Sequence, residues 1–234
     1  TAIWWVRRDL RLGDNPALAR ALQAAEQVAA VFILDPSLLR SAYVGEKRLA
    51  FLFQGLAQLD AALRLRGGRL ILRQGEPAAE LARLAAETGA QGIYAEADFS
   101  PYARARDRRA AARLPVSWTG LPVVYPPEVV LKPDGTPYTV FTPFSRRWKA
   151  LPPPAALLPV PASIPAPEGI ASLDLPGSLG APAWQPTTQE ALRIFPAGEA
   201  EALRRLGYFS GGRDAPVVYC QDVRNWMGVE GTSQ

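Results

Sequence analysis

Short apolar runs alternate with longer amphipathic segments through the first half of this 234-residue chain. The apolar runs lie at residues 3–6, 28–34, 69–73, 92–96 and 116–118. The segments between them carry apolar residues at three- and four-residue spacing, which is typical of helices packed on a sheet. Because strands joined by right-handed helical crossovers run parallel, this order predicts a Rossmann-like α/β fold. We expect a doubly wound, parallel five-stranded sheet with helices on both faces.

The alternation ends in a stretch that is rich in proline. Ten prolines lie within residues 150–186, a density that breaks helices and central strands and predicts an extended connector. Apolar periodicity resumes over residues 187–206, which we expect to form one helix. The sequence therefore predicts three parts: an α/β domain at 1–125, a proline-rich connector at 126–186, and the truncated start of an all-helical domain at 187–234.

Composition excludes several classes of function. The chain has no histidine and one cysteine, which removes histidine-based triads and ordinary zinc sites, so we expect no metal. A net charge of +4 is too small to indicate nucleic-acid binding by itself. The longest clean apolar run, residues 28–34, is far shorter than the about 20 residues that span a bilayer. With no leader pattern at the N-terminus, we expect a cytoplasmic monomer without a membrane partner.

Ligands of doubly wound sheets bind at the carboxyl ends of the strands, so the loops that follow the strands are the candidate sites. Residues 7–16 follow the first strand and contain no Gly-rich phosphate loop, which disfavours NAD-type binding; a solvated loop with internal ion pairs also fits them. Asp35 and Asp98 follow the second and fourth strands. Such carboxylates, beside apolar neighbours, suit a flat polar heterocycle, but each also suits a helix cap.

The segment after the fourth strand is rich in arginine. On a helix, Arg104 lies beside Arg108, and Arg109 lies beside Arg113. Like charges at this spacing repel mildly, which favours either a phosphate or nucleic-acid partner or a solvated face. Of these two interpretations, we prefer the solvated face.

Several motifs follow one another in a recognisable order. Residues 5–12 read Trp-Val-Arg-Arg-Asp-Leu-Arg-Leu, and residues 14–18 read Asp-Asn-Pro-Ala-Leu. Further matches lie at residues 32–36, 47–48, 101–107 and 135–144. This collinear set resembles the DNA photolyase and cryptochrome family and covers essentially the whole chain.

The resemblance implies a division of labour between two halves. In that family the α/β domain binds an antenna chromophore, and a larger helical half binds FAD and damaged DNA. The excited antenna passes energy to reduced FAD, which donates an electron to a flipped-out pyrimidine dimer and splits it. This chain then corresponds to the antenna half of a deoxyribodipyrimidine photolyase, as a fragment or a truncated product. We expect it to be inactive alone, to retain no FAD, and to bind damaged DNA weakly or not at all.

Two other functions remain open. A non-catalytic cryptochrome-type photoreceptor module carries the same motifs. A nucleotide-binding domain of the electron-transfer-flavoprotein or stress-protein kind shares the fold class, but the missing Gly-rich phosphate loop and the long collinear match disfavour it.

The resemblance also implies binding residues, whereas no catalytic residue is assigned. The segment after the fourth strand lacks the Asn/Glu pair of folate-binding members, so an antenna of the 8-hydroxy-deazaflavin or FMN type is favoured over folate. The expected antenna-side residues are Arg11, Phe32, Leu34, Asp35, Arg48, Asp98 and Tyr102. The expected FAD-side residues are Tyr219, Thr232 and Ser233, with Tyr208 as the rival for Tyr219.

Overall fold

The computed structural model describes residues 1–41, 44–153, 156–174 and 185–211. Five parallel strands form one sheet in the order β3-β2-β1-β4-β5, as the sequence predicts. The strands are β1 (Ala2–Val6), β2 (Val28–Leu34), β3 (Leu70–Gln74), β4 (Ile93–Ala95) and β5 (Val116–Trp118). The strands β2 and β3 are added on one side of β1, and β4 and β5 are added on the other side. The position between β1 and β4 is therefore a topological switch point, where this architecture places its ligands.

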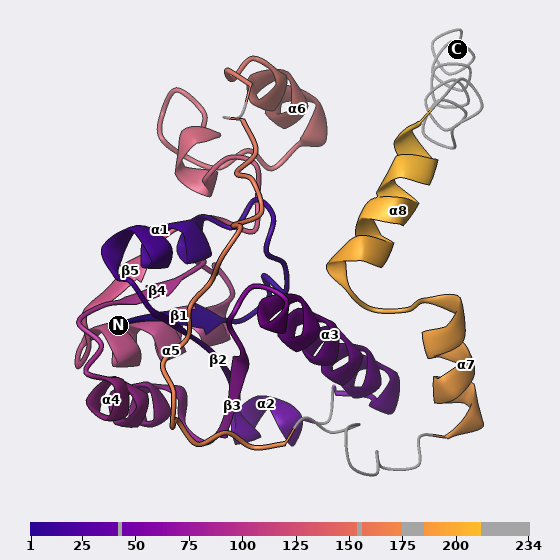
Figure 1. Ribbon diagram of the computed structural model, residues 1–234. Helices are drawn as coiled ribbons and strands as arrows, with labels where there is room; N and C mark the ends of the chain where they lie inside the picture. The colour runs from indigo at the N-terminus through magenta and orange to yellow at the C-terminus, as the bar shows by residue number, and fades with distance from the viewer. Residues whose placement is uncertain (42–43, 154–155, 175–184, 212–234) are drawn as a thin grey trace, which may run out of the picture.

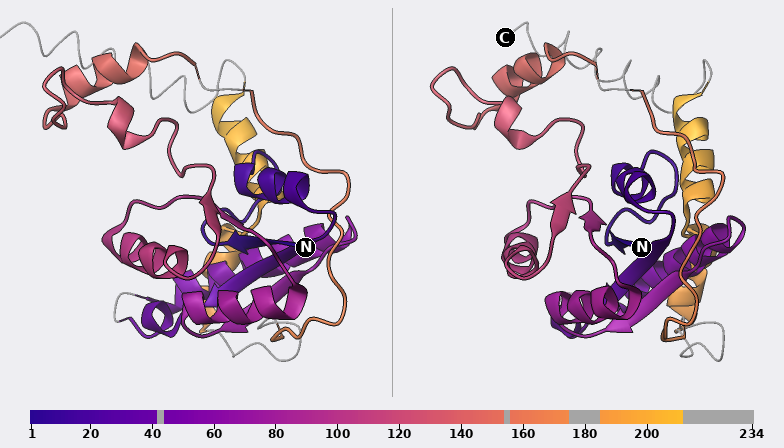
Figure 2. Two further views of the ribbon diagram at one scale, coloured as in Figure 1. Left: turned by 90° about the vertical axis from the view of Figure 1, so that its left-hand side faces the viewer. Right: turned by 60° about the vertical axis from the view of Figure 1, so that its left-hand side comes forward.

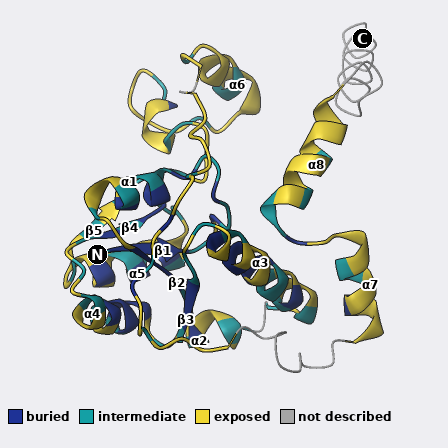
Figure 3. Cartoon of the chain, viewed as in Figure 1, coloured by how far each residue is buried: buried dark blue, intermediate teal, exposed yellow. Residues whose placement is uncertain are grey.

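Helices cover both faces of the sheet (Figures 1 and 3). Residues of α1 (Pro16–Ala24) and α3 (Glu46–Arg64) pack in one core cluster, with Trp4, Leu18 and Leu56 among its members. Residues of α4 (Pro77–Thr88) and α5 (Pro101–Ala111) belong to a second cluster on the opposite face, around Trp5 and Leu81. Neighbouring residues of β1 therefore enter different cores, as the period of two in a strand requires. We call residues 2–118 the α/β body.

Four helices of the α/β body begin in the same way. In each, a side chain accepts a backbone N–H of the first turn and proline occupies the first turn, which suits its missing N–H. The capping residues are Asn15, Asp35, Glu76 and Ser100. Asp35 caps α2 (Pro36–Leu39), a short helix that the sequence pattern did not predict.

The connector runs as an extended strap along the α/β body (Figure 2). The Val28 N–H donates to the Pro165 carbonyl at 2.8 Å, and the Ile164 N–H donates to the Arg66 carbonyl at 2.8 Å. Farther along, the Leu173 N–H donates to the Leu72 carbonyl at 2.8 Å. Ile164 is fully buried, so the strap contributes to the core as well as to the hydrogen bonding.

A small lobe, residues 121–151, stands apart from the sheet in Figures 1 and 2. It contains a 3-10 turn, η1 (Pro127–Val129), and a helix, α6 (Phe141–Lys149). Its aromatic residues pack mainly on one another: the ring centroids of Tyr125 and Trp148 lie 5.3 Å apart, edge to face. The connector that the sequence predicts at 126–186 therefore contains a helix, α6, ahead of its dense prolines, and the sequence pattern did not predict this helix.

The expectation of one helix over residues 187–206 is wrong. The structure has two helices, α7 (Pro186–Ile194) and α8 (Glu199–Ser210), separated by Pro196 and by Gly198 at φ +123°. Proline removes a helical hydrogen bond, and a positive φ lies outside the right-handed helical region. We call residues 185–211 the α7–α8 arm; α7 packs along α3, while α8 has no buried residue.

Candidate functional site

A cavity of about 260 Å³ lies at the carboxyl ends of β1 and β2, beside the loop that follows β4 and the start of α5. It has an aromatic and apolar part, to which Trp5, Phe32 and Tyr102 belong, and a polar part formed by acidic and arginine side chains. The complete lining is Trp5, Val6, Arg7, Arg8, Phe32, Ile33, Asp35, Leu38, Pro77, Asp98, Ser100, Tyr102, Ala103 and Arg106. This mixture of flat rings and a few placed charges is typical of small-molecule sites.

Two buried arginines line the cavity from different elements. Arg7 follows β1 and Arg106 lies on α5, with side chains only 7% and 9% exposed. Both are held by Asp107: Arg7 Nη1 donates to its two oxygens at 2.8 Å each, and Arg106 Nε donates to Oδ1 at 2.9 Å. Both guanidinium groups also lie over the Trp5 ring, 4.9 and 5.0 Å from its centroid. The arginines are therefore fixed before any ligand arrives.

The same two arginines have unused donors. Among the described residues, Nη2 of Arg7 and Nη2 of Arg106 are buried without a hydrogen-bond partner. Arg106 Nη2 lies 2.9 Å from Asp107 Oδ1 as an ion pair, but it is not aligned for a hydrogen bond. Burial lowers the pKa of Arg7, against the opposing effect of Asp107. Buried charged donors without an acceptor are costly, so this cavity is suited to a ligand that brings one.

Asp35 and Tyr102 form a hydrogen-bonded pair at the edge of the cavity. Asp35 accepts from the Ser37 N–H at 2.9 Å as the cap of α2, and it also accepts from the Tyr102 hydroxyl. Burial, together with Asp35, raises the pKa of Tyr102 to about 12. Tyr102 therefore keeps its proton at neutral pH, and Asp35 serves both the helix and the cavity.

Asp98 lies at the other side of the cavity, in the loop after β4. Its carboxylate accepts from the Ser100 N–H at 2.9 Å and lies 3.7 Å from Arg8 Nη1. Partial burial acts to raise the pKa of Asp98, but the Ser100 hydrogen bonds and the Arg8 charge outweigh it and lower the pKa. Asp98 is thus an anion at neutral pH that already has partners.

The loop after β1 is held together internally around Asp9. This buried carboxylate accepts from Trp4 Nε1 at 3.3 Å, from the Arg7 N–H at 3.0 Å and from Asn15 Nδ2 at 3.1 Å. Farther along the loop, Arg11 Nη2 lies 3.4 Å from Glu96 Oε1. The loop is therefore held by internal hydrogen bonds around a buried Asp9, whereas its ion pairs reach residues outside it, so the interpretation as a solvated loop with internal ion pairs does not hold.

Four of the seven expected antenna-side residues lie on the cavity: Phe32, Asp35, Asp98 and Tyr102. The other three do not line it. Arg11 bonds to the Asp14 carbonyl and Glu96, Leu34 belongs to the core cluster of α1 and α3, and Arg48 is exposed on the first turn of α3.

The expected FAD-side residues are not placed by this structure. Tyr219, Thr232 and Ser233 lie outside the described residues. Their rival, Tyr208, is described and is exposed on α8.

The sequence reasoning missed Trp5, Arg7 and Arg106, which supply one of the three aromatic rings and two of the three arginines of the cavity. Two signals in the sequence point to them. Arg7 is the first residue after the first strand, and Arg106 lies one helical turn after Tyr102, on the same helix face. The contact between them is not visible in the sequence, because it depends on how α5 packs against β1.

Comparison with known proteins identifies the family of this chain. Residues 2–166 match the model of the DNA photolyase family. The chain belongs to this family. It is 38% identical over 242 residues to an uncharacterized 31.6 kDa protein of Synechococcus sp., a match covering 99% of this chain and 81% of that protein. It is 34% identical over 248 residues to cryptochrome DASH of Natronomonas pharaonis, covering all of this chain and 52% of that protein.

Solved structures agree with the sequence comparison. A bacterial class III photolyase from Agrobacterium tumefaciens superposes with a TM-score of 0.81 at 29% identity, over 89% of this chain and 44% of that one. This photolyase family member therefore spans about half the length of the cryptochrome DASH and photolyase relatives named here. Across the described ranges, no helix has the length and apolar character needed to cross a membrane.

Proposed function

We propose that this photolyase family member binds a light-harvesting chromophore in the cavity at the carboxyl ends of β1 and β2. It would serve as the antenna part of a light-driven, FAD-dependent enzyme that repairs pyrimidine dimers in DNA. Photolyases as a family combine a flavin with an antenna chromophore, and family membership carries that general chemistry to this chain.

The observation that carries the proposal is the pair of buried arginines. Arg7 and Arg106 line the cavity and are held by Asp107 and Trp5, yet each keeps an Nη2 without a hydrogen-bond acceptor among the described residues. A structural salt bridge alone would not need these two donors. A ring with carbonyl or anionic oxygens would bring an electronegative group next to this arginine pair.

The dimensions favour a ring system over a dinucleotide. The cavity volume of about 260 Å³ is slightly below the roughly 300–1,000 Å³ of drug-sized sites. Phe32 and Tyr102 would contact the ring, while the arginines and the carboxylates would meet its polar edge. We favour an 8-hydroxy-deazaflavin or FMN type of antenna over folate, because the segment after β4 lacks the Asn/Glu pair of folate-binding members.

The absorption spectrum of the purified chain tests this proposal. The protein as isolated, followed by denaturation and extraction of any small molecule, should yield a flavin-type or deazaflavin spectrum. If the preparation is colourless, FMN should bind when added. A reduced-folate spectrum would overturn the flavin-type assignment, and the absence of any bound chromophore under both conditions would overturn the antenna proposal.

A matched pair of phenylalanine variants locates the site. Phe32→Ala removes an aromatic wall of the cavity, and we expect the dissociation constant of the chromophore to rise by about tenfold or more. Phe51→Ala changes an exposed ring on α3 that is not part of the cavity and should leave affinity unchanged. Equal affinities for the two variants would place the chromophore elsewhere.

DNA repair by these residues alone is a separate part of the proposal. We expect these 234 residues alone to retain no FAD, to bind damaged DNA weakly or not at all, and to remain monomeric. Incubation with cyclobutane-dimer DNA under blue light should therefore leave the dimers intact. Measured repair by this chain would contradict the assignment of the antenna function alone.

A cryptochrome-type photoreceptor module is the second candidate, favoured by a match to a cryptochrome DASH that covers all of this chain and 52% of that protein. A photoreceptor must change its structure on illumination, whereas an antenna needs only to pass on energy. Hydrogen exchange of the chromophore-loaded chain, measured in darkness and under blue light, separates the two. A light-dependent change in the α7–α8 arm would favour the photoreceptor, and identical exchange would favour the antenna.

A further inference from the structure

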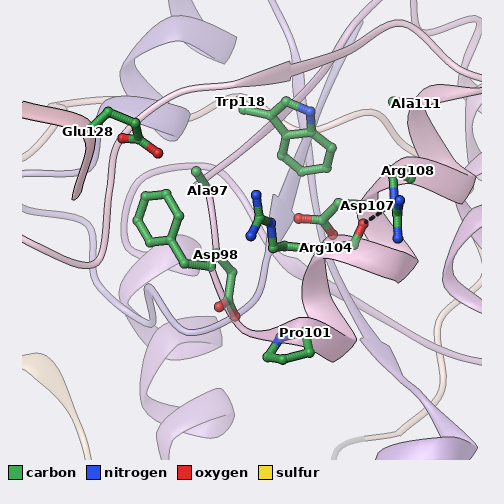
Figure 4. Close-up of a pocket in the computed structure, with 10 residues that line it drawn as sticks. Ala97, Asp98, Pro101, Arg104, Asp107, Arg108, Ala111, Trp118 and Glu128 are labelled. Atoms are coloured by element: carbon green, nitrogen blue, oxygen red, sulfur yellow. Dashed lines mark hydrogen bonds between the residues drawn. The ribbon is translucent and has the colours of Figure 1, made fainter. Parts of the chain in front are cut away.

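A second, larger hollow lies on the other side of Asp98. This cleft has a volume of about 720 Å³ and runs between the loop after β4, one face of α5, the end of β5 and η1 (Figure 4). Its lining is Ala97, Asp98, Phe99, Pro101, Arg104, Asp107, Arg108, Ala111, Trp118 and Glu128. Asp98 is part of both hollows, so a molecule held in the cavity at β1 and β2 lies next to the cleft.

The charges of the cleft are unevenly satisfied. Asp107 is engaged by Arg7 and Arg106, and Asp98 is engaged by Ser100 and lies near Arg8. In the part of the chain that the structure describes, neither Arg104 nor Arg108 has a carboxylate partner; Arg108 Nε reaches only the Arg104 carbonyl, at 3.3 Å. Among the carboxylates that line the cleft, only Glu128 has no ion-pair partner in the described part of the chain. Two unpaired arginines facing one unpaired carboxylate give the cleft a net attraction for anions.

The two arginines are placed to act together. Arg104 and Arg108 are one helical turn apart on the face of α5 that forms the floor of the cleft. In Figure 4 the Arg104 side chain extends from α5 into the hollow that Trp118 also lines. An anion between the two arginines would relieve their mutual repulsion, and the planar guanidinium suits the paired oxygens of phosphate or carboxylate.

We propose that this cleft receives the anionic tail of the chromophore whose ring lies in the adjacent cavity. The inference rests on the proposed antenna function and deepens it: Arg104 and Arg108 make the chain select a phosphorylated or carboxylated ligand over the same ring with a neutral side chain. Trp118 and Phe99 form the apolar walls along which the tail passes. The proposal thus adopts the phosphate interpretation of the α5 arginines in place of the solvated face.

Riboflavin and FMN provide a matched pair of probes, because they differ only in the terminal phosphate. Their dissociation constants for the full 234-residue chain are measured by flavin fluorescence at low salt. We expect FMN to bind roughly tenfold more tightly than riboflavin, as two charge-assisted contacts allow. The preference should shrink as salt is added, because the arginines are exposed to solvent.

Two variants on the same helix identify the residues responsible. The double substitution Arg104→Ala with Arg108→Ala should bring the ratio of the two dissociation constants close to one while leaving riboflavin affinity unchanged. Arg109→Ala removes an equal charge from α5 outside the cleft, where Arg109 lies 3.6 Å from Glu76, and should keep the preference for FMN. Both arginines are exposed, so circular dichroism should confirm that the double variant stays folded.

The outcomes separate this inference from the antenna proposal. Equal affinity of wild type for FMN and riboflavin, with both weakened by Phe32→Ala, would overturn tail selection and leave the antenna cavity intact. A preference for FMN that survives the double substitution would also overturn it. Failure of both probes to bind wild type would overturn this inference, and it would overturn the antenna proposal as well if the isolated protein also carries no chromophore. Loss of the preference only in the double variant would support both.

Discussion

The α/β body and the α7–α8 arm contain similar amphipathic helices, but they use them differently. In the α/β body, Leu56 of α3 is fully buried, and so is every residue of β1. In the arm, Leu203, Leu206 and Phe209 of α8 are 44–59% exposed, and the helix buries none of its residues (Figure 3). Helical periodicity thus predicts where a helix forms, but it does not show whether the apolar face has a partner.

The arm is attached by a small number of polar contacts. The Gln185 N–H donates to Glu46 at 2.7 Å, and the Ala197 N–H donates to Gln54 at 2.7 Å. The carboxylate of Glu199, the first residue of α8, accepts from the backbone N–H groups of Leu12 and Gly13 at 2.8 and 2.9 Å. The body is therefore stabilised mainly by apolar burial, whereas the arm is positioned by the packing of α7 along α3 and by hydrogen bonds at the start of α7 and between α7 and α8.

The largest expected effect comes from equal truncations in the two regions. Leu56→Ala leaves a cavity in the core and should lower the free energy of unfolding by about 3 kcal/mol. Leu206→Ala removes the same atoms from a side chain that is 58% exposed and should change it by less than about 0.5 kcal/mol. Urea unfolding followed by circular dichroism measures both, and similar losses would show that α8 is buried as deeply as α3.

Buried and exposed aspartates give the next contrast. The Asp9 carboxylate accepts three hydrogen bonds. In Asp9→Asn the new NH2 group must face at least one of the three N–H donors, so we expect the free energy of unfolding to fall by about 2 kcal/mol. Asp134→Asn changes a similar turn-forming carboxylate in the exposed lobe, where it accepts from the Thr136 N–H at 2.9 Å. In thermal unfolding, Asp9→Asn should lower the melting temperature clearly, and Asp134→Asn should leave it nearly unchanged. A larger decrease for Asp134→Asn would contradict this account of the loop after β1.

The junction between body and arm is tested at Glu199. Glu199→Gln presents an amide donor to one of the two N–H groups and should weaken the contact by about 1 kcal/mol. Amide hydrogen exchange of Leu12 and Gly13 should then accelerate, while exchange in β1 and β2 stays unchanged. Glu190→Gln, which affects only an exposed pair with Arg193 on α7, serves as the control. Unchanged exchange in the Glu199 variant would mean that the arm docks without this contact.

The smallest effect concerns the pH dependence of stability in the body. Burial, aided by Asp9 and opposed by Arg11, raises the pKa of Glu96 above its ordinary value of 4.5. The native chain then holds a proton that the unfolded chain has lost, so stability relative to Glu96→Gln falls as pH rises from 4.5 through the raised pKa. Urea midpoints of both proteins between about pH 4 and pH 8 measure the difference. A difference that grows with pH would show that Arg11 outweighs burial.

Local sequence signals predicted most of the α/β body. All five strands and the helices α1, α3, α4 and α5 lie where the alternation of apolar runs and longer segments placed them, and prolines begin α1, α4 and α5. The same reasoning failed over residues 187–206. The apolar periodicity continues past Pro196, but the helix does not, because proline cannot donate the helical hydrogen bond. It also missed α6, because the dense prolines that follow it dominated the interpretation of the connector.

For the candidate site, the sequence named the loops but only part of the lining. Phe32, Asp35, Asp98 and Tyr102 follow from strand ends and motif matches, and all four lie on one cavity. Arg48 matches the motif equally well and lies away from that cavity, on α3. A motif match supplies a residue type and a position in the chain, whereas the distance to a ligand depends on how the helices pack.

The order of strands and helices, the parallel sheet and the family were within reach of the sequence alone, since each depends on local periodicity, caps and short motifs. Only the tertiary structure brought Arg7 and Arg106 together on Trp5 and Asp107, and only it placed Arg104 and Arg108 beside the cleft at Asp98. The physical reason is that these contacts join segments far apart in the chain. Their distances are set by the crossover connections and by side-chain packing between layers, and no local pattern encodes them.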